Sequence, residues 1–152
     1  MSTVTGRLFV GLQVLLFAAF ALLPRWWTAG WATGAWEAAI GWVLVAAGVA
    51  LGVSAGVALG RNLTPFPEPR SDGRLVTHGP YRWARHPIYG ALLLAAFGWT
   101  LLSGSLAVAL LTLVAALFFD RKRRYEERVL RRRFDGYERY RALTRVFVPF
   151  VV

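Results

Sequence analysis

Long runs of apolar residues, separated by short polar segments, constrain this 152-residue chain more than any other feature of its sequence. A helix needs about 20 apolar residues to cross a hydrocarbon core about 30 Å thick. The first two runs have this length, and the last two have about 15 residues each, which reach about 22 Å as a helix. We therefore predict an all-α, polytopic membrane protein with four transmembrane helices. The runs occupy residues 6–23, 38–60, 88–102 and 106–119.

The two shorter runs are predicted to form a helical hairpin, because Ser103-Gly104-Ser105 between them favours a tight break. To span the membrane, their helices must extend beyond the apolar residues, from near Tyr81 at the start and past Phe119 at the end. Residues 120–133 favour the second extension, because they include good helix formers and neither glycine nor proline. We expect this C-terminal helix to continue the last span into the cytoplasm.

The distribution of basic residues predicts the orientation of the chain. Five of the 18 basic residues lie in the segment 61–85, and 11 follow residue 120. The positive-inside rule places both segments in the cytoplasm, and four spans then put both termini there. The net charge of +10 suits anionic lipid headgroups, so we do not expect a nucleic-acid partner. The first run is long for a signal peptide and is predicted to be a retained helix. Abundant arginine, alanine, glycine and valine are typical of GC-rich bacteria, which suggests a bacterial inner membrane.

Glycine and tryptophan also occur at positions that are typical of membrane helices. Tryptophan marks a membrane interface around the first loop, at Trp26, Trp27, Trp31 and Trp36. Glycine recurs along the second run and lets another helix approach closely, although glycine is also simply common in membrane helices. The partner helix can belong to the same chain or to a second copy, so the oligomeric state stays open. The glycines are Gly41, Gly48, Gly52, Gly56 and Gly60.

Two polar patches carry the candidate chemistry. Pro87 suits the first turn of a helix, which places Arg85 and His86 at a helix N-terminus that favours an anion. Glu126 and Glu127 follow the last apolar run and suit an ammonium group. Together the patches fit a zwitterionic amino-acid moiety. The alternative is that Arg85 anchors the interface, while the two glutamates pair along their own helix. Three aromatic side chains near the first patch, Tyr81, Trp83 and Tyr89, suit a heterocycle or a sulfonium ion.

Several other kinds of chemistry are not expected. The chain has no cysteine, so it has neither a thiolate nucleophile nor a disulfide. His78 and His86, taken with the distant glutamates, match no spacing rule for metal ligands, and we predict no metal site. No acid or base lies in the middle of a span, which argues against a pump or a proton-coupled exporter.

At these residues the sequence resembles the isoprenylcysteine carboxyl methyltransferase family, which is related to membrane phospholipid methyltransferases. The segments that carry the resemblance are 75–81 and 85–90, then the apolar hairpin and Glu126-Glu127-x-x-Leu130. It covers about residues 61–149. The resemblance implies that S-adenosylmethionine binds between the polar loop and the C-terminal helix. The cofactor contacts that it implies are Leu75, Val76, Tyr81, His86, Pro87, Tyr89 and Glu126, to which the argument from the helix N-terminus adds Arg85.

The resemblance also implies residues for the acceptor side of the reaction. In the eukaryotic enzymes an arginine one helical turn before the first glutamate is tied to the carboxylate of the substrate. Here that position is Lys122, and Arg123 lies beside it. Glu127 is the candidate to take a proton from an amine acceptor. We therefore expect Lys122, Arg123 and Glu127 to form the catalytic set.

The expected function is methyl transfer to a lipophilic acceptor that enters from the bilayer, with carboxyl O-methylation of an isoprenylcysteine-type acceptor as the leading hypothesis. One alternative is N-methylation of a phospholipid amine. Two rivals belong to other classes: a membrane reductase that uses NADPH, and a non-enzymatic membrane assembly protein. A single domain, residues 1–152, is expected. It comprises two N-terminal spans in 1–60, and the cofactor-binding loop, hairpin and C-terminal helix in 61–152.

Overall fold

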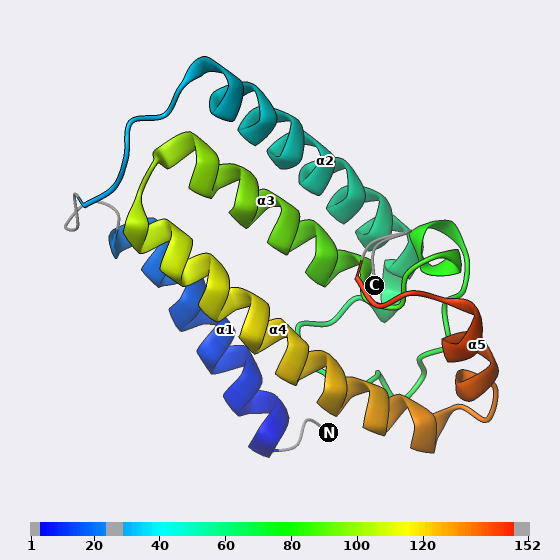
Figure 1. Ribbon diagram of the computed structural model, residues 1–152. Coiled ribbons are helices and arrows are strands. Elements are labelled where there is room, and N and C mark those ends of the chain that lie inside the picture. The colour runs from blue at the N-terminus through cyan, green and yellow to red at the C-terminus, as the bar shows by residue number, and fades with distance from the viewer. Residues whose placement is uncertain (1–3, 24–28, 148–152) are drawn as a thin grey trace.

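The computed structural model describes residues 4–23 and 29–147 and consists of helices joined by short irregular segments (Figure 1). Trp26, Trp27 and Pro149, which entered the sequence argument, lie outside these residues. No strand of a sheet occurs in the described segments, so the all-α prediction is confirmed. The α-helices are α1 (Val4–Leu22), α2 (Ala35–Leu59), α3 (Pro87–Ser103), α4 (Leu106–Arg133) and α5 (Tyr137–Leu143), and the 3₁₀ turns are η2 (Gly60–Asn62) and η3 (Gly79–Arg82).

The four long helices lie side by side in the order α1, α4, α3 and α2 (Figure 1). The chain between α2 and α3 gathers at one end of this array, together with α5 and the last turns of α4. The opposite end is tied by two backbone hydrogen bonds. Trp31 N–H donates to Gly104 O at 2.8 Å, and Leu106 N–H donates to Ala29 O at 3.0 Å. The tip of the α3–α4 hairpin therefore lies at the same level as the segment that connects α1 to α2.

Close packing of α2 against α3 depends on glycine. A Cβ atom added at Gly48 would lie 2.7 Å from Ala91 O, and one at Gly98 would lie 2.6 Å from Gly41 O. Both distances are too short for any side chain, so backbone meets backbone along this contact. A Cβ at Gly56 would meet open space. The glycine ridge of α2 therefore serves packing within the chain over its first half.

The start of α3 differs from the prediction, whereas the end of α4 agrees with it. We expected the hairpin to begin near Tyr81, but α3 begins at Pro87, after a separate 3₁₀ turn at Gly79–Arg82. The physical reason is that Pro87 disfavours helical geometry at the residue before it, and His86 is the non-helical N-cap. At the other end, α4 continues without interruption to Arg133.

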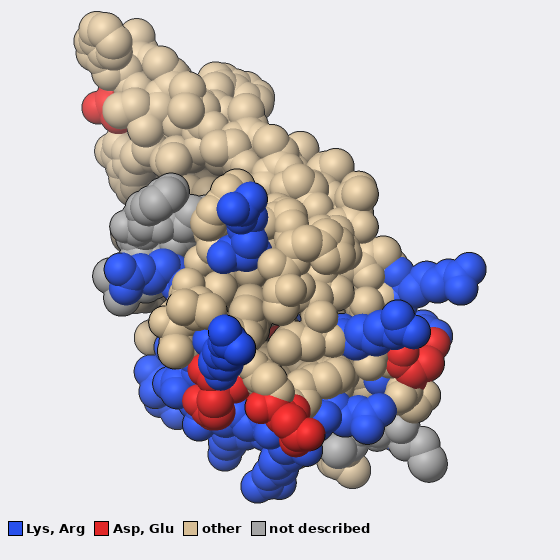
Figure 2. Space-filling view, turned by 90° about the vertical axis from the view of Figure 1, so that its right-hand side faces the viewer, with Lys and Arg blue, Asp and Glu red and all other residues tan. Residues whose placement is uncertain are grey.

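Within residues 4–23 and 29–147, two helices are long and apolar enough to cross a membrane: α1, and α2 with its 3₁₀ extension to Asn62. The next apolar helix, α3, has 17 residues. Large apolar side chains are exposed on these helices and on α4, including Trp36 at 82%, Val57 at 77% and Leu117 at 61%. Lys and Arg, in contrast, gather at one end of the molecule (Figure 2). Such a surface suits hydrocarbon over most of the array and water or headgroups at the charged end.

Candidate functional site

The last described residues hold the start of α3 in place. Arg145 N–H donates to Trp83 O, and Arg85 N–H donates to Arg145 O, each at 2.8 Å. His86 N–H donates to Val146 O at the same distance. Tyr140 on α5 adds a side-chain tie, because its hydroxyl donates to Tyr81 O at 2.7 Å. The segment 83–86 is therefore fixed by the C-terminal part of the chain before any ligand binds.

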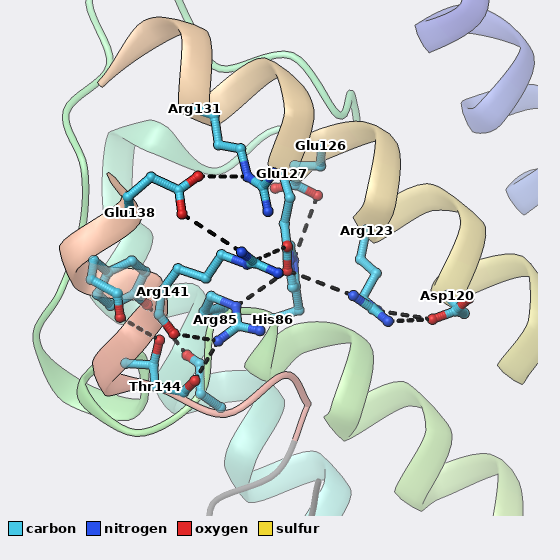
Figure 3. A network of polar contacts seen from close by, with 12 residues as sticks. Arg85, His86, Asp120, Arg123, Glu126, Glu127, Arg131, Glu138, Arg141 and Thr144 are labelled. Atoms are coloured by element: carbon cyan, nitrogen blue, oxygen red, sulfur yellow. Dashed lines mark hydrogen bonds and ion pairs between the residues drawn. The ribbon is translucent and has the colours of Figure 1, made fainter. Parts of the chain in front are cut away.

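Glu127 is the centre of a buried ion-pair network (Figure 3). Its Oε1 lies 3.2 Å from Arg85 Nε and 3.2 Å from His86 Nε2. Arg141 on α5 approaches Oε2 at 3.5 Å, and Arg123, one turn earlier on α4, approaches Oε1 at 3.8 Å. The guanidinium of Arg85 also donates to the carbonyl oxygens of Arg141 and Thr144. This network joins α3, α4 and α5.

The same network keeps Glu127 ionised. Burial by itself would raise the pKa of its carboxyl group. The hydrogen bond with His86, the electrostatic effect of that ring and the positive charge of Arg85 outweigh burial and lower the pKa from 4.5 to about 2. Glu127 is therefore a carboxylate at neutral pH and has more than one cationic partner, which suits a positioning role better than proton transfer.

A cavity of about 540 Å³ lies beside this network, between the loop 59–76, the start of α3 and one face of α4. Seven of the eight predicted cofactor contacts line it: Leu75, Val76, Tyr81, Arg85, His86, Tyr89 and Glu126. The eighth, Pro87, is buried in the first turn of α3 and is not part of the lining. Residues far apart in the sequence therefore meet at one cavity, in agreement with their predicted grouping.

His86 separates the two glutamates. Its Nε2 faces Glu127, while its Nδ1 lies 3.8 Å from Glu126 Oε2. Glu126 also accepts a hydrogen bond of 2.7 Å from the Tyr89 hydroxyl, and its side chain is 25% exposed. Tyr89 stacks between His86 and Phe119, with ring centroids 5.4 and 5.0 Å away. Glu126 is thus the carboxylate of the pair that the cavity can reach.

Lys122 also lines the cavity, although it is only 2% exposed. Its ammonium donates to Gln13 Oε1 on α1 at 2.6 Å and to Pro65 O at 2.9 Å. Both acceptors are neutral amide oxygens, and no ion pair of the described residues includes Lys122. Burial lowers the pKa of Lys122, while the charges of Glu126 and Glu68 act in the opposite direction. The result is a buried ammonium group at the edge of the cavity.

Three residues of the sequence argument lie elsewhere. Arg123 and Glu127, expected to be catalytic with Lys122, line a separate groove on the other side of α4. Arg123 donates to Asp120 at 3.0 Å, and Glu127 is held as described above. Trp83, expected to meet a ligand, is 48% exposed and is not part of the cavity lining. The helical period explains the first two: Lys122 and Glu126, four residues apart, share the face of α4 that lines the cavity, and the residue after each of them is turned away from that face.

Sequence reasoning missed several polar residues in the lining, among them Gln13, Glu68, Tyr137 and Tyr140. Gln13 was detectable as an amide inside an apolar run. Tyr137 is 1% exposed, and its hydroxyl has no hydrogen-bond partner among the described residues. A buried polar group without a partner is uncommon and requires an explanation. No sequence pattern reveals an unpaired hydroxyl, because pairing depends on the tertiary structure.

The fold and this site together define a class: an apolar helical protein that holds, at one end of its helices, a small-molecule-sized cavity with charged groups in its wall. Comparison with known proteins makes this class specific. The phospholipid methyltransferase family matches residues 36–136, and the chain belongs to this family. The family resemblance predicted from the loop and hairpin motifs is therefore confirmed.

Individual relatives agree with the family. A probable protein-S-isoprenylcysteine O-methyltransferase of Oryza sativa subsp. indica is 34% identical over 116 residues, which are 74% of this chain and 61% of that protein. The cobalt-zinc-cadmium resistance protein CzcN of Cupriavidus metallidurans is 40% identical over 81 residues, 53% of this chain and 38% of that protein. This chain thus spans less than two thirds of each relative's length.

A solved structure shares the fold. The eukaryotic intramembrane Ras methyltransferase, isoprenylcysteine carboxyl methyltransferase, superimposes with a TM-score of 0.67 and 30% sequence identity. The match covers 76% of this chain and 43% of that one. Together with the long apolar helices, this likeness identifies the chain as an integral membrane protein.

Proposed function

We propose that this protein is an S-adenosylmethionine-dependent methyltransferase that acts on a lipophilic acceptor, with an isoprenylcysteine-type carboxylate as the leading candidate. The observation that carries the proposal is the position of Glu126, whose carboxylate lines a cavity beside His86 and Tyr89. Its relatives include methyltransferases of the isoprenylcysteine type, which supports the same reaction class.

The residues of the cavity fit this cofactor. The volume of about 540 Å³ lies within the range of roughly 300–1,000 Å³ usual for small-molecule sites. Glu126 attracts a cationic group, and the unpaired Tyr137 hydroxyl offers a hydrogen bond to a polar group of a ligand. Leu75 and Val76 add apolar surface to the wall of the cavity. When bound, the cofactor supplies a methyl group activated by a positively charged sulfur.

The chain's own residues then position the reactants. Arg85 and Glu127 fix the ring of His86, and His86 in turn supports Glu126 and Tyr89. The helices and the loop exclude water from the inner wall of the cavity, which strengthens the electrostatic contacts made there. In this scheme Glu127 and Arg123 act through other residues, and Lys122 is the group that meets the acceptor.

The buried ammonium of Lys122 favours an anionic acceptor. Its hydrogen-bond acceptors within the protein are neutral, so a carboxylate or phosphate oxygen in the cavity would add a direct ion pair to the longer-range attraction of Glu126 and Glu68. A carboxylate acceptor needs no proton removed. A phospholipid amine, the second candidate because of the family's description, must lose a proton, and a carboxylate of the lining, Glu126 or Glu68, would have to accept it.

We further propose four membrane crossings with both ends and the cavity on the cytoplasmic side of a bacterial inner membrane. The hairpin tip is hydrogen-bonded to the connection between α1 and α2, which supports equal depth for all four helices. The 17 residues of α3 span about 25 Å at 1.5 Å per residue. The basic end of the molecule supports the cytoplasmic orientation.

Calorimetric titration of the purified protein with S-adenosylmethionine, and separately with NADPH, tests the cofactor. We expect micromolar binding of S-adenosylmethionine, and a loss of at least tenfold in affinity for Glu126→Gln, because the cation loses its carboxylate. Glu37→Gln is the matched control, since Glu37 is exposed on the first turn of α2 and lies outside the cavity. Binding of NADPH alone would show that the site belongs to a reductase.

Transfer of a radiolabelled methyl group tests the acceptor. Two substrates are offered under the same conditions: a farnesylated cysteine analogue and phosphatidylethanolamine in mixed micelles. Methylation of the first supports the carboxylate hypothesis, and methylation of the second alone would replace it with N-methylation. Cofactor binding without transfer to either would remove both acceptor classes and leave the cofactor assignment standing.

A further inference from the structure

Six arginines surround an open groove of about 690 Å³ on the side of α4 that faces away from the cavity. The groove extends from the first turns of α1, at Thr5 and Phe9, to α5. Its lining contains a single carboxylate, Glu127, which is already held by the buried network. The arginines are Arg121, Arg123, Arg124, Arg128, Arg131 and Arg141.

Four of these six arginines have carboxylate partners within the protein. Asp120 pairs with Arg123 and Arg124, while Glu138 pairs with Arg131 and Arg141. The other two, Arg121 and Arg128, are exposed, and neither forms an ion pair with a described residue. The guanidinium of Arg128 is placed over the ring of Tyr125, 5.7 Å from its centroid. The groove therefore keeps uncompensated positive charge.

The level of the groove along the helices indicates what it meets. Arg121 follows directly after Asp120, where the apolar run that ends at Phe119 gives way to charge. Phe9 of α1 packs against Phe118 on the apolar side of this boundary and against Tyr125 on the charged side, with centroids 6.0 and 5.5 Å apart. From here exposed leucines such as Leu12 and Leu117 continue along α1 and α4. The groove thus lies where lipid headgroups meet acyl chains.

We propose that this groove binds the phosphate of an anionic phospholipid headgroup, whose acyl chains lie along the exposed faces of α1 and α4. Guanidinium groups suit this ligand, because their planar fork donates two hydrogen bonds to a phosphate. A soluble phosphate would gain nothing from the adjoining apolar surface. The site is separate from the cavity and does not depend on the reaction proposed for it.

Binding is measured with the full chain in phosphatidylcholine nanodiscs that contain increasing amounts of phosphatidylglycerol, using the unfolding midpoint as the readout. We expect phosphatidylglycerol to raise the midpoint of the wild type. The double variant Arg121→Gln/Arg128→Gln should need about tenfold more of this lipid for the same rise. Each arginine near an anionic membrane surface contributes substantially to the free energy of lipid binding. Both side chains are exposed, so the variant should unfold like wild type in phosphatidylcholine alone.

Arg132→Gln/Arg139→Gln is the matched control, because it removes the same charge from exposed arginines outside the groove. It should respond to phosphatidylglycerol within about twofold of wild type, since salt screens the attraction between the lipid and an exposed charge outside the groove. An equal loss in both double variants would reduce the effect to diffuse surface charge. An equal midpoint rise with inorganic phosphate would point to a soluble anion. If phosphatidylglycerol does not raise the midpoint, the proposal is overturned, and an acidic polypeptide becomes the favoured ligand of the groove.

Discussion

At the scale of single residues, the site contains polar groups of two kinds. Some have all their partners within the protein, such as Glu127 and the Tyr140 hydroxyl. Others face the cavity, and the protein leaves part of their capacity for hydrogen bonds or ion pairs unused. Tyr137 has an unpaired hydroxyl, and Lys122 has neutral partners for a positive charge. The second kind is where a ligand would be recognised, because binding satisfies groups that folding left unsatisfied.

Two tyrosines one turn apart on α5 separate these roles. Tyr137→Phe removes an unpaired buried hydroxyl, so stability should stay equal or rise, while affinity for S-adenosylmethionine should fall about three- to tenfold. Tyr140→Phe removes the hydrogen bond to Tyr81 O and should cost about 1–2 kcal/mol of stability. Thermal unfolding and calorimetric titration measure the two effects. Unchanged affinity in Tyr137→Phe would mean that the hydroxyl contacts no ligand.

Glu127 makes a prediction about pH. Its carboxyl has a lower pKa in the folded protein, about 2 instead of 4.5, so ionisation stabilises the fold above pH 4.5 and this contribution is lost as the pH falls toward 2. The shift corresponds to about 3 kcal/mol at neutral pH. Wild type should therefore exceed Glu127→Gln in stability at pH 7, with the difference shrinking between pH 5 and 2. Chemical denaturation across this range measures it, and a constant difference would contradict the assignment.

At the scale of elements, the contact between α2 and α3 is set by the absence of side chains. Gly48 faces the backbone of Ala91 and Ala95, and Gly98 faces that of Gly41. Because α3 begins at Pro87, directly after His86, its placement against α2 also sets the position of the site residues at its first turn. The glycine contact thus contributes to the geometry of the cavity without lining it.

Alanine at two glycines of α2 should act with opposite signs. Gly48→Ala places a methyl group 2.7 Å from Ala91 O and should destabilise the protein by about 1–3 kcal/mol. Gly56→Ala enters open space and should stabilise the helix by about 0.5–1 kcal/mol. Unfolding midpoints in the same detergent measure both. A neutral Gly48→Ala would show that the two helices separate easily.

At the scale of the whole molecule, charge and apolar surface are segregated along the helices. Charged side chains gather at the end that holds the loop 60–86 and α5, whereas exposed apolar side chains cover the long helices (Figure 2). The cavity therefore lies at the charged end, next to apolar surface. This arrangement would let the water-soluble cofactor and the lipid-soluble acceptor that we propose approach the same cavity from different phases.

Cysteine labelling tests the membrane topology, because the chain has no cysteine of its own. Ser71→Cys and Ala32→Cys each introduce one exposed thiol, in the polar loop and in the connection between α1 and α2. With a membrane-impermeant maleimide, Ser71→Cys should react in inside-out vesicles and Ala32→Cys in right-side-out vesicles. Reaction of both from the same side would exclude the proposed arrangement of four crossings.

Much of the architecture follows from local sequence. The apolar runs predict the four long helices, the serine-glycine-serine break predicts the hairpin, and the residues after Phe119 predict the continuation of α4. These features depend on neighbouring residues, which is why they can be derived without a structure. The early start expected for α3 was wrong. That expectation came from the length of a full membrane span, whereas Pro87 is a local signal that disfavours helix at the residue before it.

Sequence by itself, through the family's motif, also predicted that Leu75 and His86 lie near Glu126, and these three residues line one cavity. Only the tertiary structure decided that Glu126 and Lys122 line the cavity while Glu127 and Arg123 face the other side of α4. It alone brought Gln13 of α1 to Lys122 and left the Tyr137 hydroxyl unpaired. The physical reason is that a helix face, a buried partner and a missing partner are defined by packing between distant segments, and no local pattern encodes them.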